Sequence, residues 1–279
     1  MIKSEEYIEK FKDEYSFRLA KKTLDVYKTA LEQLFNHCEK PFKEITVKDI
    51  RNWLVFLDSN GYRPTAVKTK LAGLKLFYKY CLEEEIITHN PLASIGFPKV
   101  EETLPRYLQI DQLTQLRKIV EGKLWERAII ETLYATGIRL SELAAMKKDD
   151  IDWSERIIHI PQGKGKKARI VLFTNACAAH LNAYIQNRQD DLPFVFVNPF
   201  GRKKVGTRTI NTRFETYSKL LGFPLTPHTL RHTFAAHLAI KGMPLECIQV
   251  LLGHDSPHQT QIYARLYNYA RKQKYDEWM

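Results

Sequence analysis

Residues 224–238, PLTPHTLRHTFAAHL, place a histidine and an arginine at the start of a predicted helix. Thr226 is a preferred N-cap, and Pro227 suits the first helical position because its missing N–H needs no partner there. His228 then lies in the first turn, and Arg231 lies three residues later on the same face. A helix N-terminus favours anions, an arginine can bind two phosphate oxygens, and a histidine can donate or accept a proton. The segment predicts a phosphate site; a capped helix whose arginine forms only a salt bridge is the alternative.

Histidines of this segment could instead bind a metal ion. His228 and His232 stand four residues apart, as the ligands of zinc helices do. No glutamate follows the first histidine as in HExxH, and no third ligand is placed nearby, so we expect neither a metal nor another cofactor. The four cysteines lie far apart and form no CxxC pair, so we expect buried thiols in a reducing cytoplasm.

The segment LLGHDSPHQTQIYARLY adds another histidine and a tyrosine. Gly253 ends a predicted helix, His254 follows it, and Tyr263 lies nine residues after His254. A histidine beside a phosphate can stabilise or protonate a leaving oxygen, and a tyrosine hydroxyl can attack phosphorus to form a covalent phosphotyrosine. Because the chain contains 14 tyrosines, an ordinary packing role for Tyr263 is the alternative.

Two further segments carry polar residues at breaks in structure. In YATGIRLSELAAM, Arg139 follows a glycine at a helix break and Glu142 lies three residues later, where its carboxylate could orient a neighbour. In PQGKGKKA, Lys164 lies between two glycines that would let it approach a ligand closely. Lys166 and Lys167 share that loop, and the GxxxxGK[ST] pattern of a P-loop is absent. Taken alone, each segment also fits a solvated turn or a surface ion pair.

The order and spacing of these segments resemble the tyrosine recombinase, or phage integrase, family. The similarity is to its compact Xer-like members and extends over nearly the whole chain. By this resemblance Arg139 and Arg231 bind the scissile phosphate, and Glu142 supports the site. The remaining positions match the family's general acid, its two box-two histidines and its nucleophile, which here are Lys164, His228, His254 and Tyr263, respectively.

The resemblance implies site-specific cleavage and rejoining of double-stranded DNA through a 3′-phosphotyrosine, without a cofactor. It implies four protomers around two duplexes, either all of this chain or shared with a related recombinase. In the family, a C-terminal tail such as residues 264–279 docks on a neighbouring protomer; packing on its own domain is the alternative. Two other functions remain open at this point: a type IB topoisomerase, and a non-catalytic DNA-binding protein of the same fold.

A polar stretch bracketed by prolines, PKVEETLPR, divides the chain. We expect a helical core-binding (SAM-like) domain at residues 1–98, a linker at 99–106 and a catalytic domain at 107–279. The first part shows apolar residues at helical spacing throughout. The fold class is therefore mainly α, with a mixed α/β catalytic domain that contains a small antiparallel hairpin or sheet.

The catalytic part alternates helical and β-branched patterns. Its strands are expected at residues 157–160 and 169–173, on either side of the lysine-rich turn. Its helices are expected at residues 111–120, 124–136, 140–146, 175–188, 207–221, 227–240, 245–252 and near 256–264.

Positive charge is concentrated in the second part. The net charge is +11, of which residues 99–279 carry +9, with 27 basic and 18 acidic side chains. In the first part, Lys68, Lys75 and Lys79 share one stripe of a predicted helix, and no acid occurs between Asp58 and Glu83. This stripe could follow a DNA backbone, although a solvated lysine face is equally compatible with it. The chain has no apolar run of membrane-spanning length and begins with acidic residues, so we expect a cytoplasmic protein without membrane contact.

Overall fold

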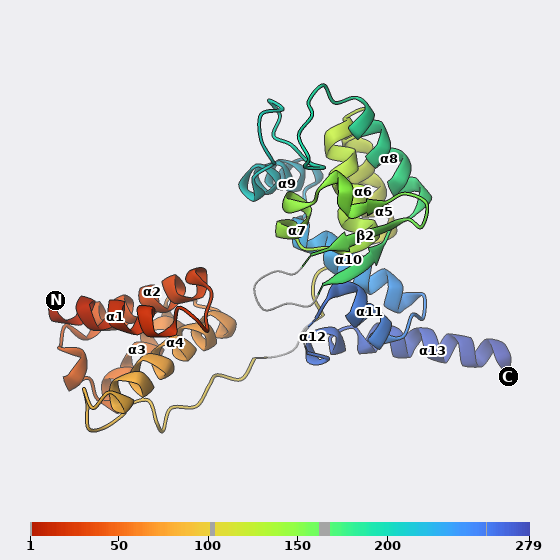
Figure 1. The fold of residues 1–279 in the computed structure, drawn as a ribbon. Coiled ribbons are helices and arrows are strands. Elements are labelled where there is room, and N and C mark those ends of the chain that lie inside the picture. The colour runs from red at the N-terminus through yellow and green to blue at the C-terminus, as the bar shows by residue number, and fades with distance from the viewer. Residues whose placement is uncertain (1, 101–103, 162–167, 255) are drawn as a thin grey trace. The chain divides into compact units, whose positions relative to one another are not determined.

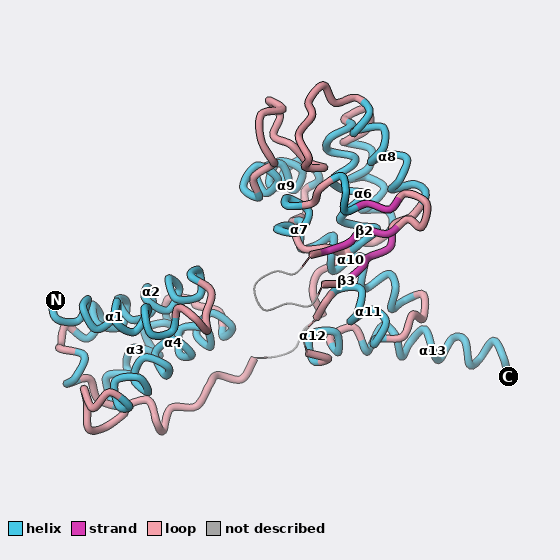
Figure 2. Tube along the Cα trace, in the orientation of Figure 1, coloured by secondary structure: helices cyan, strands magenta, loops and turns pink. Residues whose placement is uncertain are grey.

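The computed structural model describes residues 2–100, 104–161, 168–254 and 256–279 (Figure 1). The chain forms two compact units, Met1–Glu101 and Glu102–Met279, and the division lies within the stretch 99–106. Helices predominate in both units, and the three short strands lie together in the second (Figure 2). The fold class expected from the sequence, mainly α with a small antiparallel sheet, is confirmed.

The first unit is a helical bundle whose boundaries follow local capping signals. Thr46 caps one helix by accepting from the amide of Asp49, whose carboxylate accepts the Thr46 amide in return. Pro64 occupies the first helical position of another. The elements are α1 (Ile2–Tyr15), α2 (Lys21–Cys38), η1 (Phe42–Glu44), α3 (Val47–Ser59) and α4 (Pro64–Glu83).

Close packing of α2 against α4 organises the core of this unit. Gly73 on α4 is needed there, because a Cβ at this position would lie 2.6 Å from the ring of Tyr27. Trp53, Phe77 and Tyr78 are buried in the same core, and the Tyr78 hydroxyl donates to the carbonyl of Phe42 at 2.9 Å. The bundle is therefore a domain with its own hydrophobic core. The face of α4 that does not pack into this core is exposed to solvent.

The second unit surrounds helix α10 with the elements that carry the candidate site. The α10 helix packs against α6, α11 and α13, and most of its side chains are buried. The elements are α5 (Ile110–Ile119), α6 (Leu124–Thr136), α7 (Leu140–Ala145), η2 (Lys148–Asp150), β1 (Ile151–Asp152), β2 (Ile157–Ile160), β3 (Arg169–Leu172), α8 (Asn175–Gln186), α9 (Thr207–Leu221), α10 (Pro227–Ile240), α11 (Leu245–Leu252), α12 (His258–Gln261) and α13 (Ala264–Trp278).

The strands form one antiparallel sheet in the order β1-β2-β3, with Ile158 opposite Val171. Both of these side chains are buried in the larger hydrophobic cluster of the unit, together with α6, α8 and α9. The sheet therefore fixes the position of β3 over the site. The two-residue strand β1 was not expected from the sequence, because it is too short to show alternation.

Two expectations need correction. A helix was expected near residues 256–264, but α12 spans only His258–Gln261, the chain turns at Tyr263, and α13 begins at Ala264. The Tyr263 side chain at this turn is buried and only 1% exposed. Of the four cysteines, Cys81 and Cys177 are buried, whereas Cys247 is exposed. In the described part of the chain no helix combines the length and the apolar character needed to cross a membrane.

Candidate active site

Helix α10 brings Arg231 into the centre of the second unit. The helix begins with a reciprocal capping box between Thr226 and Thr229, as the Thr-Pro sequence predicts. One turn later the Arg231 guanidinium, in a residue 5% exposed, donates to the carbonyl of Gly137 at 2.6 Å and to that of Leu252 at 2.8 Å. Burial and the neighbouring Arg139 lower the pKa of Arg231 to about 10, so it stays charged at neutral pH. These contacts use two of its five N–H donors and leave the others for a ligand.

The break between α6 and α7 positions Arg139. Gly137 ends α6 with φ +61°, and a Cβ there would lie 2.3 Å from the ring of Phe234, so both backbone and packing require glycine. Arg139 then precedes α7, where its amide donates to Glu142 Oε2 at 2.8 Å and its guanidinium donates to Oε1 at 3.0 Å. The second terminal nitrogen of Arg139 donates to the carbonyl of Gly253 at 2.7 Å. Glu142 and the helix break therefore fix this guanidinium.

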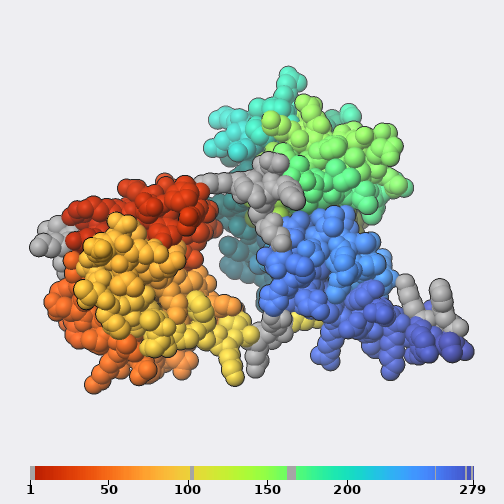
Figure 3. All heavy atoms as spheres, turned by 60° about the horizontal axis from the view of Figure 1, so that its bottom comes forward, coloured from red at the N-terminus to blue at the C-terminus, as the bar shows by residue number. Residues whose placement is uncertain are grey.

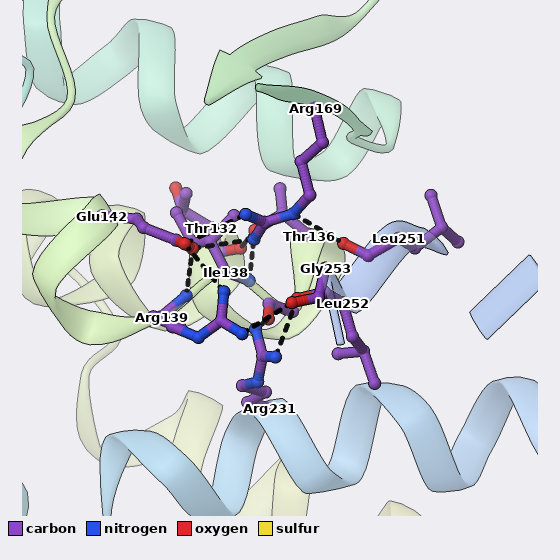
Figure 4. A network of polar contacts seen from close by, with 11 residues as sticks. Thr132, Thr136, Ile138, Arg139, Glu142, Arg169, Arg231, Leu251, Leu252 and Gly253 are labelled. Carbon is purple, nitrogen blue, oxygen red and sulfur yellow. Dashed lines mark hydrogen bonds and ion pairs between the residues drawn. The ribbon is translucent and has the colours of Figure 1, made fainter. Parts of the chain in front are cut away.

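Three arginines meet at the C-terminus of α11 (Figure 4). Arg169, Arg231 and Arg139 donate to the carbonyls of Leu251, Leu252 and Gly253, respectively. The last carbonyls of a helix have no partner within the helix and carry partial negative charge, so guanidinium groups suit them. The arginines come from β3, α10 and the α6–α7 break. The end of α11 is thus the point where these elements are joined.

His254 follows this end directly. Its Nδ1 lies 2.8 Å from the buried hydroxyl of Thr260 on α12. Burial, and then the charges of Arg231 and Arg139, lower the pKa of His254 to about 4. Burial and the same two arginines lower the pKa of His228. Both imidazoles are therefore neutral at pH 7, and each can offer one N–H to an anion.

Tyr263 is held by a histidine of α10. Its hydroxyl lies 2.5 Å from Nδ1 of His232, and burial raises its pKa well above the usual value, against the opposing charge of Arg231. Burial and then the neighbouring His228 lower the pKa of His232 to about 3. The pair is therefore a neutral imidazole hydrogen-bonded to a protonated phenol. His228, which the sequence suggested as the proton acceptor for Tyr263, lies next to His232, with the ring centroids 4.2 Å apart.

The structure thus gathers Arg139, Glu142, His228, Arg231, His254 and Tyr263 in one unit. Lys164 lies outside the described residues. Sequence reasoning missed three contributors, Arg169, His232 and Thr260. The only signal for His232 was its i, i+4 spacing from His228, which was considered solely as a zinc pattern. Among the described residues no group of three or more His, Cys, Asp or Glu side chains could hold a metal ion.

The lysine stripe lies on α4 of the first unit. Lys68 and Lys79 are exposed, and Lys79 forms an ion pair with Glu83 at 3.4 Å. Lys75 is half-buried: its Nζ donates to the carbonyl of Leu92 at 3.1 Å and lies over the ring of Phe97. The three side chains therefore differ in how freely they could reach a phosphate.

Comparisons with known proteins identify the family of the chain. Residues 106–269 match the model of the phage integrase family, and residues 8–88 match that of the phage integrase N-terminal SAM-like domain. The tyrosine recombinase XerC of Chlamydia pneumoniae is 34% identical over 250 residues, which cover 86% of this chain and 80% of that protein. The XerC of Thermodesulfovibrio yellowstonii is 35% identical over 260 residues, covering 88% and 85%.

Solved structures show the same fold. The crystal structure of XerA recombinase matches with a TM-score of 0.56 and 30% identity, covering 98% of both chains. A lambda integrase dimer bound to a COC′ core site matches with a TM-score of 0.77 and 21% identity, covering 91% of this chain and 96% of that one. The chain belongs to the phage integrase family and is a compact, Xer-like, site-specific tyrosine recombinase that cleaves and rejoins DNA.

Proposed function

We propose that the second unit cleaves one strand of a double-stranded recombination site by attack of Tyr263 on the scissile phosphate. The observation that carries this proposal is the convergence, around the end of α11, of the Arg139 and Arg231 guanidinium groups with a tyrosine–histidine pair. Arg139 and Arg231 each retain unused N–H donors that could bind the non-bridging oxygens.

The arginines and histidines stabilise the charge that develops during attack. Negative charge builds on the non-bridging oxygens in the transition state, and each preorganised donor of this kind contributes roughly 3–4 kcal/mol. His228 at the N-terminus of α10 and His254 after α11 each supply one N–H. For His254 to donate from Nε2, its Nδ1 must accept from the Thr260 hydroxyl, which lies within hydrogen-bond distance. The Thr260 hydroxyl can donate this bond and so is compatible with the tautomer that has its proton on Nε2.

The bonds exchanged balance without ATP or a divalent metal. The Tyr263 oxygen bonds to phosphorus while the bond from phosphorus to the 5′-oxygen breaks. The tyrosine proton passes to His228, and Lys164, by resemblance, protonates the departing 5′-oxygen. A 5′-hydroxyl from another strand then reverses the step. Because Tyr263 is buried and bonded to His232, the α12 segment must expose the hydroxyl before attack.

Assembly on DNA involves both units and the C-terminal helix. We expect the exposed lysines of α4 to contact the flanking backbone. The first half of α13 packs on its own unit through Leu266, Tyr267 and Ala270, with Tyr269 exposed on its opposite face, whereas its second half projects from that unit with Tyr275 exposed (Figures 1 and 3). The projecting half is the part proposed to dock on a neighbouring protomer, of this chain or of a related recombinase, in a tetramer on two duplexes.

The decisive experiment uses Tyr263→Phe and a nicked suicide substrate that traps the covalent complex. The unmodified chain should form a protein–DNA adduct, and the variant should bind the site but form none. An adduct with Tyr263→Phe would refute the nucleophile. Relaxation of a plasmid without recombination sites would instead point to topoisomerase activity.

A further inference from the structure

Arg169, the first residue of β3, has no role in the chemistry described so far, yet it contacts the centre of the site. Its side chain is 11% exposed and makes three hydrogen bonds. Two bind Glu142 in a bidentate, end-on arrangement, from the terminal nitrogens to Oε1 at 3.0 Å and to Oε2 at 2.7 Å. The third runs from Nε to the carbonyl of Leu251 at 3.2 Å. All three are visible in Figure 4.

The two hydrogen bonds to Glu142 affect the position of Arg139, because Arg139 binds the same carboxylate. One carboxylate is shared by two guanidinium groups, and Arg169 binds it with both terminal nitrogens while Arg139 donates to it from a single terminal nitrogen. The bidentate pairing is the stronger arrangement. If Arg169 were absent, Glu142 would attract Arg139 into that geometry and away from the carbonyl of Gly253. Arg169 therefore keeps the phosphate-binding arginine available by satisfying its carboxylate partner.

The hydrogen bond to the carbonyl of Leu251 affects the position of His254. Leu251 begins the run of three carbonyls that ends directly before His254, and the stem of Arg169 packs against the same turn. A Cβ on Gly253 would lie 2.8 Å from Cδ and 2.9 Å from Nε of Arg169, so the glycine makes room for this side chain. The one side chain thus fixes both the carboxylate that orients Arg139 and the turn that presents His254.

We propose that Arg169 is a positioning residue for DNA cleavage, which acts through Glu142 on Arg139 and through the end of α11 on His254. The proposal rests on the phosphate-binding function proposed for Arg139. It assigns Arg169 no contact with the reacting phosphate.

The test compares Arg169→Lys and Arg169→Gln with the unmodified chain. Cleavage of a suicide substrate is measured in a single turnover at saturating protein, and DNA affinity is measured separately by fluorescence anisotropy. We expect the cleavage rate on bound DNA to fall about 10-fold for Arg169→Lys and about 100-fold for Arg169→Gln, while Kd changes less than about 3-fold. A wild-type cleavage rate for Arg169→Gln, or losses of equal size in rate and affinity, would overturn the proposal.

Arg188→Lys is the matched control. Arg188 is also a largely buried arginine of the second unit, where it pairs with Asp190 and donates to the carbonyls of Phe194 and Val195, outside the site. Arg188→Lys should lower the thermal midpoint with no change in the cleavage rate of the folded, DNA-bound protein. If it slowed cleavage as much as Arg169→Lys does, general destabilisation would explain both results and the proposal would fail.

A double-mutant cycle with Glu142→Gln separates positioning from a merely structural role. Because Arg169 acts mainly through Glu142, Arg169→Lys should cost about 10-fold in the unmodified chain and no more than about 3-fold beside Glu142→Gln. Fully additive effects would refute the proposed route. The experiment with Tyr263→Phe tests a different claim. A covalent adduct with that variant would refute the proposed function, whereas additive effects in the double-mutant cycle would refute only the inference about Arg169.

Discussion

Replacing Arg231 by lysine should make cleavage sensitive to alkaline pH. The surroundings of Arg231 lower its pKa from 12.5 to about 10, a difference of about 2.5, chiefly through burial and then through the charge of Arg139. Lysine has an ordinary pKa of about 10.4, so the same surroundings would bring the ammonium group introduced by Arg231→Lys to about 8. The arginine resists such neutralisation only because its own pKa starts so high.

The assay is the pH dependence of the second-order cleavage rate, which reports the ionisation of the free enzyme. The protonated ammonium is the competent form, so the rate of Arg231→Lys should fall as pH rises through about 8. The cleavage rate of the unmodified chain should show no such decrease below about pH 9.5. Below pH 7 the variant should still be slower, roughly 100-fold, because an ammonium group cannot reproduce the planar fork. A profile for Arg231→Lys that parallels the unmodified chain through pH 9 would refute this account of the site.

Three other substitutions test separate parts of the structure. Gly137→Ala should lower the free energy of unfolding by about 1–3 kcal/mol in urea titrations, because its backbone is left-handed and Phe234 fills the space; unchanged stability would contradict this. Burial raises the pKa of Glu142, but hydrogen bonds from Arg169 and Arg139 outweigh it and hold this pKa at about 2 instead of 4.5, so the ionised form should contribute about 3 kcal/mol above pH 4.5 and lose this as pH falls toward 2. The difference in the free energy of unfolding between the unmodified chain and Glu142→Gln should therefore shrink as pH falls through this range. A difference that stays constant would contradict the lowered pKa of Glu142. Lys68→Gln should flatten the log–log salt dependence of DNA binding by about 0.9, whereas an unchanged slope would exclude a phosphate contact.

Local signals account for the helix ends that the sequence predicted correctly around the candidate site. Thr226 and Pro227 set the start of α10 through interactions within one turn, so the position of His228 and Arg231 on its face followed directly. The glycines that end α6 and α11 are both left-handed, a conformation that side chains disfavour, and they mark where Arg139 and His254 lie. The resemblance then supplied the roles.

Helical periodicity was less informative for the lysine stripe. It placed Lys68, Lys75 and Lys79 on neighbouring positions of α4 as expected. It could not show that the chain beyond the helix returns to Lys75, where Leu92 accepts from its ammonium group and Phe97 lies beneath it. Which lysines remain free to meet DNA is therefore a property of the folded domain.

The sequence by itself thus determined the family and most of the elements, because these depend on short-range preference or on order along the chain, and it proposed six residues able to act on a phosphodiester. Tertiary structure alone decided which groups meet. Arg139 reaches Gly253 across 114 positions, Arg169 reaches Leu251 across 82, and His232 reaches Tyr263 across 31. Such pairs form only because the packing of α6, α10, α11 and β3 brings unmatched carbonyls, carboxylates and hydroxyls to donors that lack partners on their own element. That packing placed Arg169 and His232 in the candidate site and buried Tyr263.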